Sequence, residues 1–180
     1  MIKVVGGKYR SRILQTPDQG TEPTKNRVRE AIASAIGDLV PGAIVLDLFA
    51  GSGAFGIECL SRGAGEAHFV DLSPVAISII KGNLRSLHEE HGHCHQMDYR
   101  SYLQQGHQPL YDLVFLDPPY ADKEAYANAV SMLLAGNLLS QNAAIILEYE
   151  GGIAVDLSSF AKLKEYTYGK TKVLIARRSL

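Results

Sequence analysis

Apolar positions divide the chain into a short N-terminal part and a longer part in which strand and helix patterns alternate. Residues 2–5 and 9–16 predict two extended segments joined by a turn at Gly6-Gly7. A polar stretch follows, and the main pattern begins only after it. We therefore expect an N-terminal β-hairpin extension at 1–22 and a single globular domain at 23–180.

The domain is expected to open with a helix and to continue as strand–helix units. Pro23-Thr24 begin this helix, and Gly37 ends its run of apolar residues at helical spacing. Helices that alternate with strands over short connections indicate an α/β fold. We expect a Rossmann-like, mostly parallel sheet of seven strands, the last two forming an antiparallel hairpin. Further helices are predicted at 54–62, 74–87 and 124–135, and strands at 43–48, 67–71, 93–97, 111–116, 143–149, 162–168 and 171–178.

The composition is that of an ordinary globular domain, with 46% of the 180 residues apolar and 21% charged. No apolar run approaches the ~20 residues that cross a bilayer, and the N-terminus lacks a signal-peptide pattern. Cys59 and Cys94 are the only cysteines, without the spacing of a zinc site or a disulfide framework. We expect a cytoplasmic monomer without a membrane partner.

Charge is distributed unevenly along the chain. The first 30 residues hold seven basic and three acidic residues, a net charge of +4, so the other 150 carry −5 of the total of −1. This asymmetry is typical of a nucleic-acid contact surface, although a solvated basic edge would show it too. The residues expected to contact nucleic acid are Lys8, Arg10, Arg12, Arg27 and Arg29.

A glycine-rich loop lies between the first strand of the domain and its helix. Gly51, Gly53 and Gly56 fit the G-x-G-x-x-G pattern of dinucleotide sites. Asp71 follows Gly51 by 20 residues, where an acidic group can hold a ribose. On this pattern alone the cofactor could be NAD, or the glycines could serve packing only. The negative charge of Asp47, however, would repel a pyrophosphate, and it favours a ligand with a cationic amino group or sulfonium.

Other residues near the strand ends extend the expected cofactor site. Asp98 follows the third strand as Asp71 follows the second. The Asp98 carboxylate can accept a hydrogen bond from an adenine amino group, and the Asp71 carboxylate can accept hydrogen bonds from ribose hydroxyls. The residues expected around the cofactor are Asp47, Phe49, Ala50, Gly51, Ser52, Gly53, Asp71, Leu72, Asp98 and Tyr99.

The tetrapeptide Asp117-Pro118-Pro119-Tyr120 follows an apolar strand, which places it at the carboxyl edge of the sheet, where ligands bind in such folds. Its two prolines stiffen the turn. The Asp117 carboxylate and the Pro118 carbonyl can each accept a proton of an exocyclic amine, which aims the nitrogen lone pair at a methyl carbon. Tyr120 can stack on the base. The tetrapeptide therefore predicts amine methylation by positioning and electrostatics, and a strand-terminating turn is the alternative.

A family resemblance is carried by four segments: 6–12 (GGKYRSR), 23–30 (PTKNRVRE), 46–54 (LDLFAGSGA) and 117–120 (DPPY). Together they resemble the RsmD-type methyltransferases of bacterial small-subunit (16S) ribosomal RNA, which modify a guanine at N2. The resemblance implies a class I methyltransferase fold, S-adenosylmethionine as cofactor, and an N-terminal hairpin that faces RNA. It also implies that Thr24 and Arg27 lie near the cofactor or the target base. The family usually has Arg and Asp where this chain has Glu22 and Asn26.

Ribosomal RNA or a small-subunit assembly particle is thus the expected partner, and three other functions stay open. They are an adenine-N6 methyltransferase acting on DNA or RNA, an NAD-linked oxidoreductase, and an RNA-binding module that holds the cofactor without turnover. His88, His91, His93 and His95 raise the question of a metal site. No carboxylate or cysteine pattern in the sequence accompanies them, so we expect a solvated helix end and edge strand, and no metal.

Overall fold

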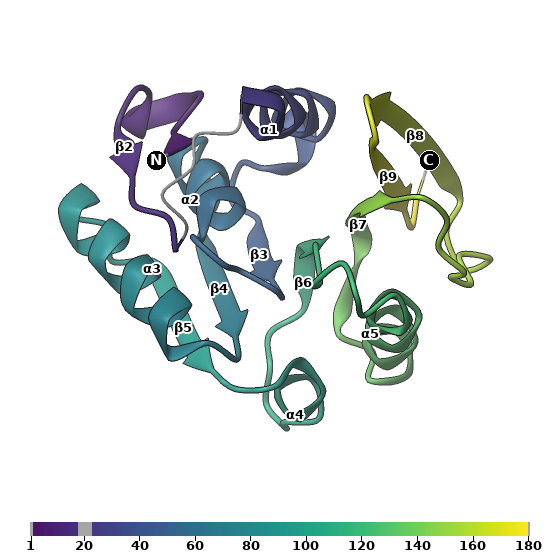
Figure 1. Cartoon of the computed structure of the whole chain (residues 1–180). Helices are drawn as coiled ribbons and strands as arrows, with labels where there is room; N and C mark the ends of the chain where they lie inside the picture. Colours follow the sequence, from purple (N-terminus) through teal and green to yellow (C-terminus); the bar gives the residue numbers. More distant parts are fainter. Residues whose placement is uncertain (1, 18–22, 180) are drawn as a thin grey trace.

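The computed structural model describes residues 2–17 and 23–179, with residues 23–25 described by their backbone alone. A seven-stranded sheet in the order β5-β4-β3-β6-β7-β9-β8 forms the centre of the molecule (Figure 1). Neighbours from β5 to β7 are parallel, and β9 runs antiparallel to β7 and β8. The expected mostly parallel sheet with a C-terminal hairpin is confirmed. Its strands are β3 (Ile44–Asp47), β4 (Glu66–Asp71), β5 (Gly92–Gln96), β6 (Tyr111–Leu116), β7 (Leu139–Glu150), β8 (Lys162–Tyr168) and β9 (Thr171–Arg177).

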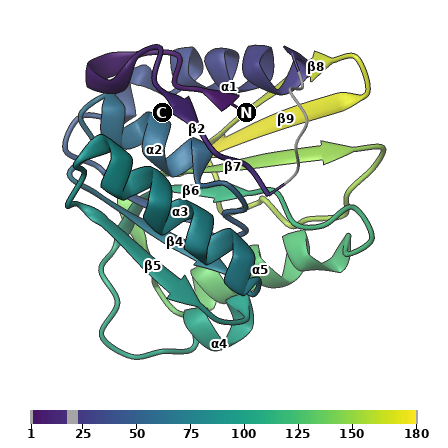
Figure 2. The ribbon, with the colours of Figure 1, turned by 60° about the vertical axis from the view of Figure 1, so that its left-hand side comes forward.

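Helices cover both faces of this sheet (Figure 2). Because alternate strand residues point to opposite faces, each strand contributes to two apolar layers. Phe69 and Phe115 pack in the layer that α1, α2 and α3 complete, whereas Val70 and Leu116 pack in the layer completed by α4 and α5. The helices are α1 (Pro23–Ala35), α2 (Ala54–Ser61), α3 (Pro74–Leu87), α4 (Tyr99–Leu103) and α5 (Glu124–Ala135), with 3-10 turns at Gly7–Tyr9 and Gly37–Leu39.

Local sequence signals fix the ends of α3. The Ser73 side chain accepts a hydrogen bond from the N–H of Ala76, and Pro74 occupies the first turn, where a missing N–H costs nothing. His88 ends the helix in the left-handed conformation, with a φ of 53°. The N-cap at Ser73 therefore starts α3 directly after the end of β4.

The expected short N-terminal β-hairpin is confirmed, but the expected strand at 9–16 is wrong over most of its length. β1 (Ile2–Lys3) and β2 (Ile13–Leu14) are antiparallel, and a 3-10 turn lies between them. The carboxylate of Glu58 in α2 accepts hydrogen bonds from the N–H groups of Val5 and Gly6, at 2.8 and 2.9 Å. Because these N–H groups donate to a side chain, they cannot donate to a neighbouring strand, and the hairpin strands stay short.

A close approach to α2 shapes the turn of this segment. Gly7 has a φ of +74°, and a Cβ at Gly7 would lie 1.8 Å from the carbonyl oxygen of Ser61. The Ser61 hydroxyl accepts a hydrogen bond from the N–H of Tyr9 at 2.9 Å, and Val4 and Leu14 are buried in the core. The segment therefore packs as part of the domain surface. The expected boundary after residue 22 falls among residues 18–22, outside the described residues, so this division stays a prediction.

Two elements differ from the sequence expectation. α4 was not expected, because a five-residue helix is too short to show a periodic pattern. β7 begins at Leu139 rather than 143 and spans 12 residues. Among the described residues, the structure has no helix of the length and apolarity that crossing a membrane requires.

Candidate active site

Acidic residues gather at the carboxyl edge of the parallel strands. Asp47 and Asp71 end β3 and β4, and Asp117 directly follows β6. Asp98 follows β5, and Glu148 lies near the end of β7. Because these strands are parallel neighbours, their carboxyl ends meet at one edge, where open α/β sheets bind ligands. This edge is the candidate active site.

The loop between β3 and α2 supplies backbone N–H groups to this edge. Gly51 and Gly53 have φ values of +54° and +75°, in the left-handed region that favours glycine. A Cβ on Gly56 would lie 2.4 Å from Cε1 of Phe69. The first two glycines therefore shape the loop, and the third lets α2 pack closely on β4.

Asp47 lies under this loop with 1% of its surface exposed. Its Oδ2 accepts a hydrogen bond from the N–H of Gly56 at 3.1 Å. Burial raises the pKa of Asp47 well above its ordinary range; the Gly56 hydrogen bond opposes this rise, and the nearby Asp117 and Asp71 carboxylates add to it. A cationic ligand would stabilise the ionised carboxylate that burial and like charge destabilise.

Asp71 joins the glycine loop to the start of α3. Its Oδ2 accepts a hydrogen bond from the N–H of Gly51, and its Oδ1 accepts one from the N–H of Ser73, both at 2.8 Å. Each oxygen keeps acceptor capacity for a ribose hydroxyl. Leu72 beside it is 68% exposed, which offers an apolar surface next to the carboxylate.

Asp98 and Tyr99 sit where α4 begins. Asp98 is the N-cap of α4, and its side chain accepts a hydrogen bond from the N–H of Arg100 at 2.9 Å. Tyr99 is buried, and its ring centroid lies 5.0 Å from that of Phe49 in the glycine loop. Asp98 therefore has a structural role in addition to the ligand contact expected for it.

Two cavities open along this edge. The first, about 270 Å³, runs between the glycine loop and the N-terminal segment. The second, about 620 Å³, lies between the tetrapeptide, the end of β7 and the turn from β8 to β9. Asp117 and Glu148 line both cavities, so they lie on the border between them. The first cavity is lined by Ile2, Thr16, Pro17, Arg29, Ile32, Asp47, Phe49, Ala50, Gly51, Ser52, Ala54, Phe55, Phe115, Asp117 and Glu148.

The second cavity is rich in aromatic side chains. Its tetrapeptide wall carries Tyr120, which is 71% exposed and has the ammonium of Lys123 5.8 Å from its ring centre. Tyr126 donates a hydrogen bond from its hydroxyl to the carbonyl of Glu148 at 2.6 Å, which fixes α5 to the end of β7. The lining residues are Asp117, Pro118, Pro119, Tyr120, Tyr126, Glu148, Tyr149, Glu150, Tyr168, Gly169, Lys170 and Thr171.

The basic residues expected to contact nucleic acid divide into two groups. Arg10 and Arg27 are exposed. Lys8 is also exposed, but its ammonium lies 2.8 Å from the Glu89 carboxylate, and Arg12 donates a hydrogen bond to the carbonyl of Ser86 at 2.8 Å. Lys8 and Arg12 therefore also hold the N-terminal segment against the rest of the domain.

Arg29 is the exception in this set, because its side chain is buried with 7% exposed. Its guanidinium donates hydrogen bonds to the carbonyl of Lys3 and to Asn26, and its Nε has no hydrogen-bond partner among the described residues. Arg29 lines the first cavity, so it faces the ligand site instead of the outer surface. Thr24 lies in the first turn of α1, and its side chain is outside the described part of the chain.

Sequence reasoning missed the contribution of β7 and the C-terminal hairpin. Glu148, Tyr126 and Tyr168 come from three elements that the order β6-β7-β9-β8 and α5 bring beside the tetrapeptide. A signal for an acidic residue at the end of β7 was available, since an acidic residue ends or follows each of the other parallel strands, but it does not distinguish Glu148 from Glu150. No comparable signal marks the two tyrosines, whose placement depends on the fold.

Comparisons with known proteins agree with this architecture. A family model described as Conserved hypothetical protein 95 matches residues 2–177. The ribosomal RNA small subunit methyltransferase D of Haemophilus influenzae is 33% identical over 173 residues, covering 93% of this chain and 89% of that protein. The solved structure of the yhhF protein of Escherichia coli superposes with a TM-score of 0.88 at 30% identity, covering 99% of this chain and 98% of the other.

A more distant neighbour shows the same fold. It is the Thermus thermophilus 16S rRNA N2 G1207 methyltransferase in complex with AdoMet and guanosine, with a TM-score of 0.71 at 18% identity, covering 90% of this chain and 44% of the other. The expected S-adenosylmethionine therefore agrees with the cofactor held by a protein of this fold.

Proposed function

The chain belongs to the RsmD methyltransferase family, and from this premise we propose that it methylates the exocyclic N2 amine of a guanine in small-subunit (16S) ribosomal RNA, with S-adenosylmethionine as methyl donor. The observation that carries the proposal is the position of Asp117 and Glu148 between the two cavities. One cavity suits the cofactor and the other suits a base, so the methyl donor and its acceptor meet at these carboxylates.

The first cavity has the chemistry that S-adenosylmethionine requires. Asp47 and the neighbouring carboxylates favour its positive charges, and the glycine loop allows close approach of the ligand to the backbone. Asp71 and Leu72 lie beside this cavity and do not line it, but Asp71 is bonded to Gly51 of its wall. The Asp71 carboxylate would accept ribose hydroxyls, and the exposed Leu72 would contact the adenine, of a cofactor that extends past the cavity. When bound, this cofactor supplies a methyl group on a sulfonium. Arg29 lines this cavity, with its Nε 3.8 Å from the Glu58 carboxylate, and its guanidinium is proposed to donate to the ligand's carboxylate.

The second cavity has the chemistry that a flipped base requires. Tyr120 offers an exposed ring for stacking, and base–aromatic stacking contributes about 1–3 kcal/mol per base. The Asp117 carboxylate and the Pro118 carbonyl would accept the two protons of the exocyclic amine. A guanine also presents an N1–H donor beside N2, for which Glu148 is a suitable acceptor. Because Asp117 would accept from the N2 amine and Glu148 from N1–H, the site favours guanine over bases that lack these two neighbouring donors.

These contacts define the roles of the protein's residues in methyl transfer. Asp117 and Pro118 hold the amine with its lone pair toward the methyl carbon, in line with the bond to sulfur. The carbon–sulfur bond breaks as the carbon–nitrogen bond forms, and S-adenosylhomocysteine leaves. One amine proton passes to the Asp117 carboxylate and on to water. Positioning and electrostatic stabilisation carry the rate enhancement.

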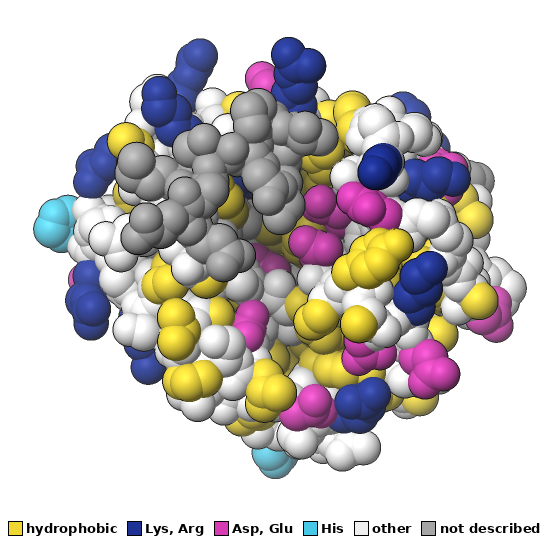
Figure 3. All heavy atoms as spheres, viewed as in Figure 1, with side chains coloured by type: hydrophobic (Ala, Val, Ile, Leu, Met, Phe, Trp, Pro, Cys, Tyr) yellow, Lys and Arg dark blue, Asp and Glu magenta, His cyan; other side chains and the backbone are white. Residues whose placement is uncertain are grey.

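A basic rim beside the cavities supports an RNA substrate. Lys and Arg side chains stand along the upper border of the face in Figure 3, where α1 and the N-terminal segment lie, and Asp and Glu side chains occupy its centre. Arg10 and Arg27 are exposed cations of this rim. We propose that residues 1–22 and α1 bind backbone phosphates, which would orient the flipped base over Tyr120.

The test is a methyl-transfer assay on three substrates: small-subunit particles from cells lacking the gene, naked 16S ribosomal RNA and duplex DNA. Each is incubated with labelled S-adenosylmethionine and then digested to nucleosides for mass spectrometry. The proposal predicts N2-methylguanosine in one of the two RNA substrates and no methylated base in DNA. N6-methyladenosine as the product would overturn the guanine assignment. The absence of any methylated nucleoside would overturn the activity.

A further inference from the structure

Histidine and glutamate side chains cluster at the edge of the sheet where β5 lies, away from the two cavities. Glu66 and His68 stand two residues apart on β4, and His93 is the register partner of His68 on β5. The side chains of all three therefore lie on one face of the sheet. One ligand atom from each, a carboxylate oxygen or an imidazole nitrogen, lies within 4.8 Å of the other two.

We propose that Glu66, His68 and His93 form a binding site for one divalent transition-metal ion, with Zn²⁺ as the best-fitting ion. Two imidazoles and one carboxylate are a ligand set that Zn²⁺ uses, with water at the remaining position. Zinc–nitrogen bonds of 2.0–2.1 Å in a tetrahedral site put ligand atoms roughly 3.3–3.5 Å apart. The Glu66 oxygens already lie 3.3 Å from Nε2 of His93 and 3.6 Å from Nε2 of His68.

The most direct sign of a missing ligand is Nε2 of His68. This atom is buried and has no hydrogen-bond partner among the described residues, although it faces a carboxylate. A buried polar atom without a partner is costly, and coordination to a cation would satisfy it.

The other nitrogen of His68 is already held. Its Nδ1 lies 3.2 Å from Nε2 of His95 and 3.4 Å from the hydroxyl of Tyr102. In the tautomer whose Nδ1–H donates to His95, the lone pair of the His68 imidazole is on Nε2, which lies 3.6 Å from the Glu66 carboxylate and is available to a metal ion. Metal-binding histidines almost always have such a partner on their second nitrogen, because it fixes the tautomer and the ring orientation. His95 and Tyr102 therefore act as positioning residues of the proposed site.

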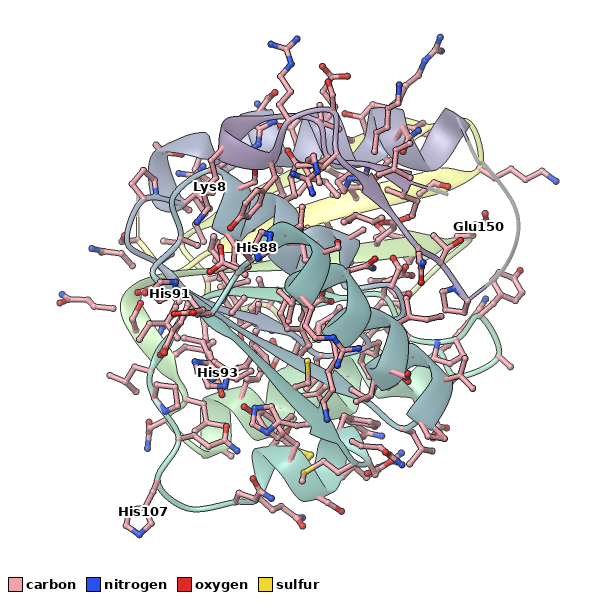
Figure 4. All side chains as sticks on the ribbon, turned by 90° about the vertical axis from the view of Figure 1, so that its left-hand side faces the viewer. Lys8, His88, His91, His93, His107 and Glu150 are labelled. Atoms are coloured by element: carbon pink, nitrogen blue, oxygen red, sulfur yellow. The ribbon has the colours of Figure 1, made fainter. Side chains whose placement is uncertain are left out.

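The site is also reachable from solvent. The side chain of His93 is 45% exposed and that of Glu66 is 34% exposed, whereas His68 is 13% exposed at the base of the cluster. Figure 4 shows His93 on the side of the molecule opposite Glu150, which lines the second cavity. A metal ion here would join edge strand β5 to β4 without touching the reaction site. Its expected effect is on stability.

Zinc binding to the full chain tests this proposal, and methyl transfer is not its readout. The protein is prepared without a polyhistidine tag, treated with EDTA, exchanged into chelator-free buffer and titrated with zinc chloride in a calorimeter. We expect one Zn²⁺ per chain and a higher melting temperature with zinc than without. Absence of binding, or binding without a rise in melting temperature, would overturn the proposal.

Matched histidine variants locate the ion. We expect His93→Asn to weaken binding by more than a hundredfold, and His95→Asn to weaken it by about ten- to a hundredfold through loss of the second-nitrogen contact. Glu66→Gln provides a second test of the ligand set and should weaken binding as His93→Asn does. His107→Asn changes an exposed histidine outside the cluster and should bind zinc like the unaltered protein. Unchanged affinity in His93→Asn would place the zinc elsewhere and contradict the assignment.

Discussion

The backbone N–H of Gly51 donates a hydrogen bond to the Asp71 carboxylate, with 2.8 Å between the nitrogen and Oδ2. This bond joins the loop after β3 to the end of β4, two strands that lie side by side in the sheet. Gly51 has a φ of +54°, and Asp71 also holds the N–H of Ser73 at the start of α3. One carboxylate thus organises both loops of the proposed cofactor site before any ligand binds.

Replacing Asp71 should therefore weaken cofactor binding for two reasons. Asp71→Ala removes the proposed acceptor for the ribose and releases the N–H of Gly51 from its partner. Hydrogen bonds to a charged group contribute about 1.5–3 kcal/mol, so we expect affinity for S-adenosylhomocysteine to fall roughly 10- to 100-fold. Isothermal titration calorimetry measures this change. Asp156→Ala, at an exposed loop position outside both cavities, is the control, and an unchanged affinity in Asp71→Ala would mean that the proposed cofactor pose is wrong.

The close approach of Gly7 to α2 predicts a large difference between two glycine substitutions. Gly7 and Gly42 both have a φ of +74°, but a Cβ on Gly7 would lie 1.8 Å from the Ser61 carbonyl oxygen, and a Cβ on Gly42 would meet nothing within 4 Å. Gly42→Ala should cost about 1–2 kcal/mol for the left-handed conformation alone. Gly7→Ala should cost more, because the segment must also move off α2. Urea unfolding measures both, and equal costs would contradict the packing described here.

Glu89 makes the attachment of the N-terminal segment sensitive to acid. Burial would raise the pKa of Glu89, but hydrogen bonds from Lys8, Tyr9 and His91 outweigh it and lower the pKa to about 2. A carboxyl whose pKa is lower in the folded state stabilises the fold above its ordinary pKa of 4.5, and this contribution is lost as the pH falls toward 2.

The matching experiment compares Glu89→Gln with the unaltered chain. Melting temperatures measured from pH 7 downward should show a constant deficit for the variant above about pH 4.5 and a shrinking one below it. Glu90→Gln, which changes the exposed neighbour, should show no such pH dependence. If the melting temperature of Glu89→Gln were lower by the same amount near pH 2 as at pH 7, the ionised Glu89 carboxylate could not be the cause.

The proposed RNA surface predicts a specific salt dependence. Arg10→Ala and Arg27→Ala each remove one exposed cation of the basic rim. If each contacts one phosphate, each substitution should lower the slope of log affinity against log salt concentration by about 0.7–0.9. RNA binding measured across a salt series gives this slope. Arg100→Ala, at an exposed position of α4 in the layer on the other face of the sheet from α1, should leave the slope unchanged. An equal effect from all three substitutions would mean that the rim has no special part in binding.

Much of the fold could be predicted because long, regular patterns carry it. The apolar runs of β3, β4 and β6 and the caps of α3 are local signals that the tertiary structure does not override. The N-terminal segment behaved differently. Its backbone donors bind Glu58 and Ser61, which lie more than 50 positions away, so no local pattern could reveal that the expected strand gives way to a 3-10 turn.

The candidate site divides in the same way. Asp47, Asp71 and Asp117 follow strand patterns, so the sequence alone predicts that they meet at one edge. Burial of Arg29 could not be predicted, because it depends on the path of β1 over α1. The cluster of Glu66, His68 and His93 joins two strands, and its carboxylate lies 27 positions before the second histidine. A search that starts from the closely spaced histidines at 88–95 therefore finds His93 but misses both Glu66 and His68.

The central claim is that Asp117 holds the target amine and contributes little to the affinity for the cofactor, although it borders the first cavity. The most direct measurement is the single-turnover rate of methyl transfer to small-subunit RNA by Asp117→Ala, with S-adenosylhomocysteine affinity measured on the same preparation. The account predicts a rate at least a hundredfold lower, as for loss of one preorganised electrostatic group, with cofactor affinity changed by less than about threefold. A variant that transfers methyl groups at the rate of the unaltered protein would contradict it.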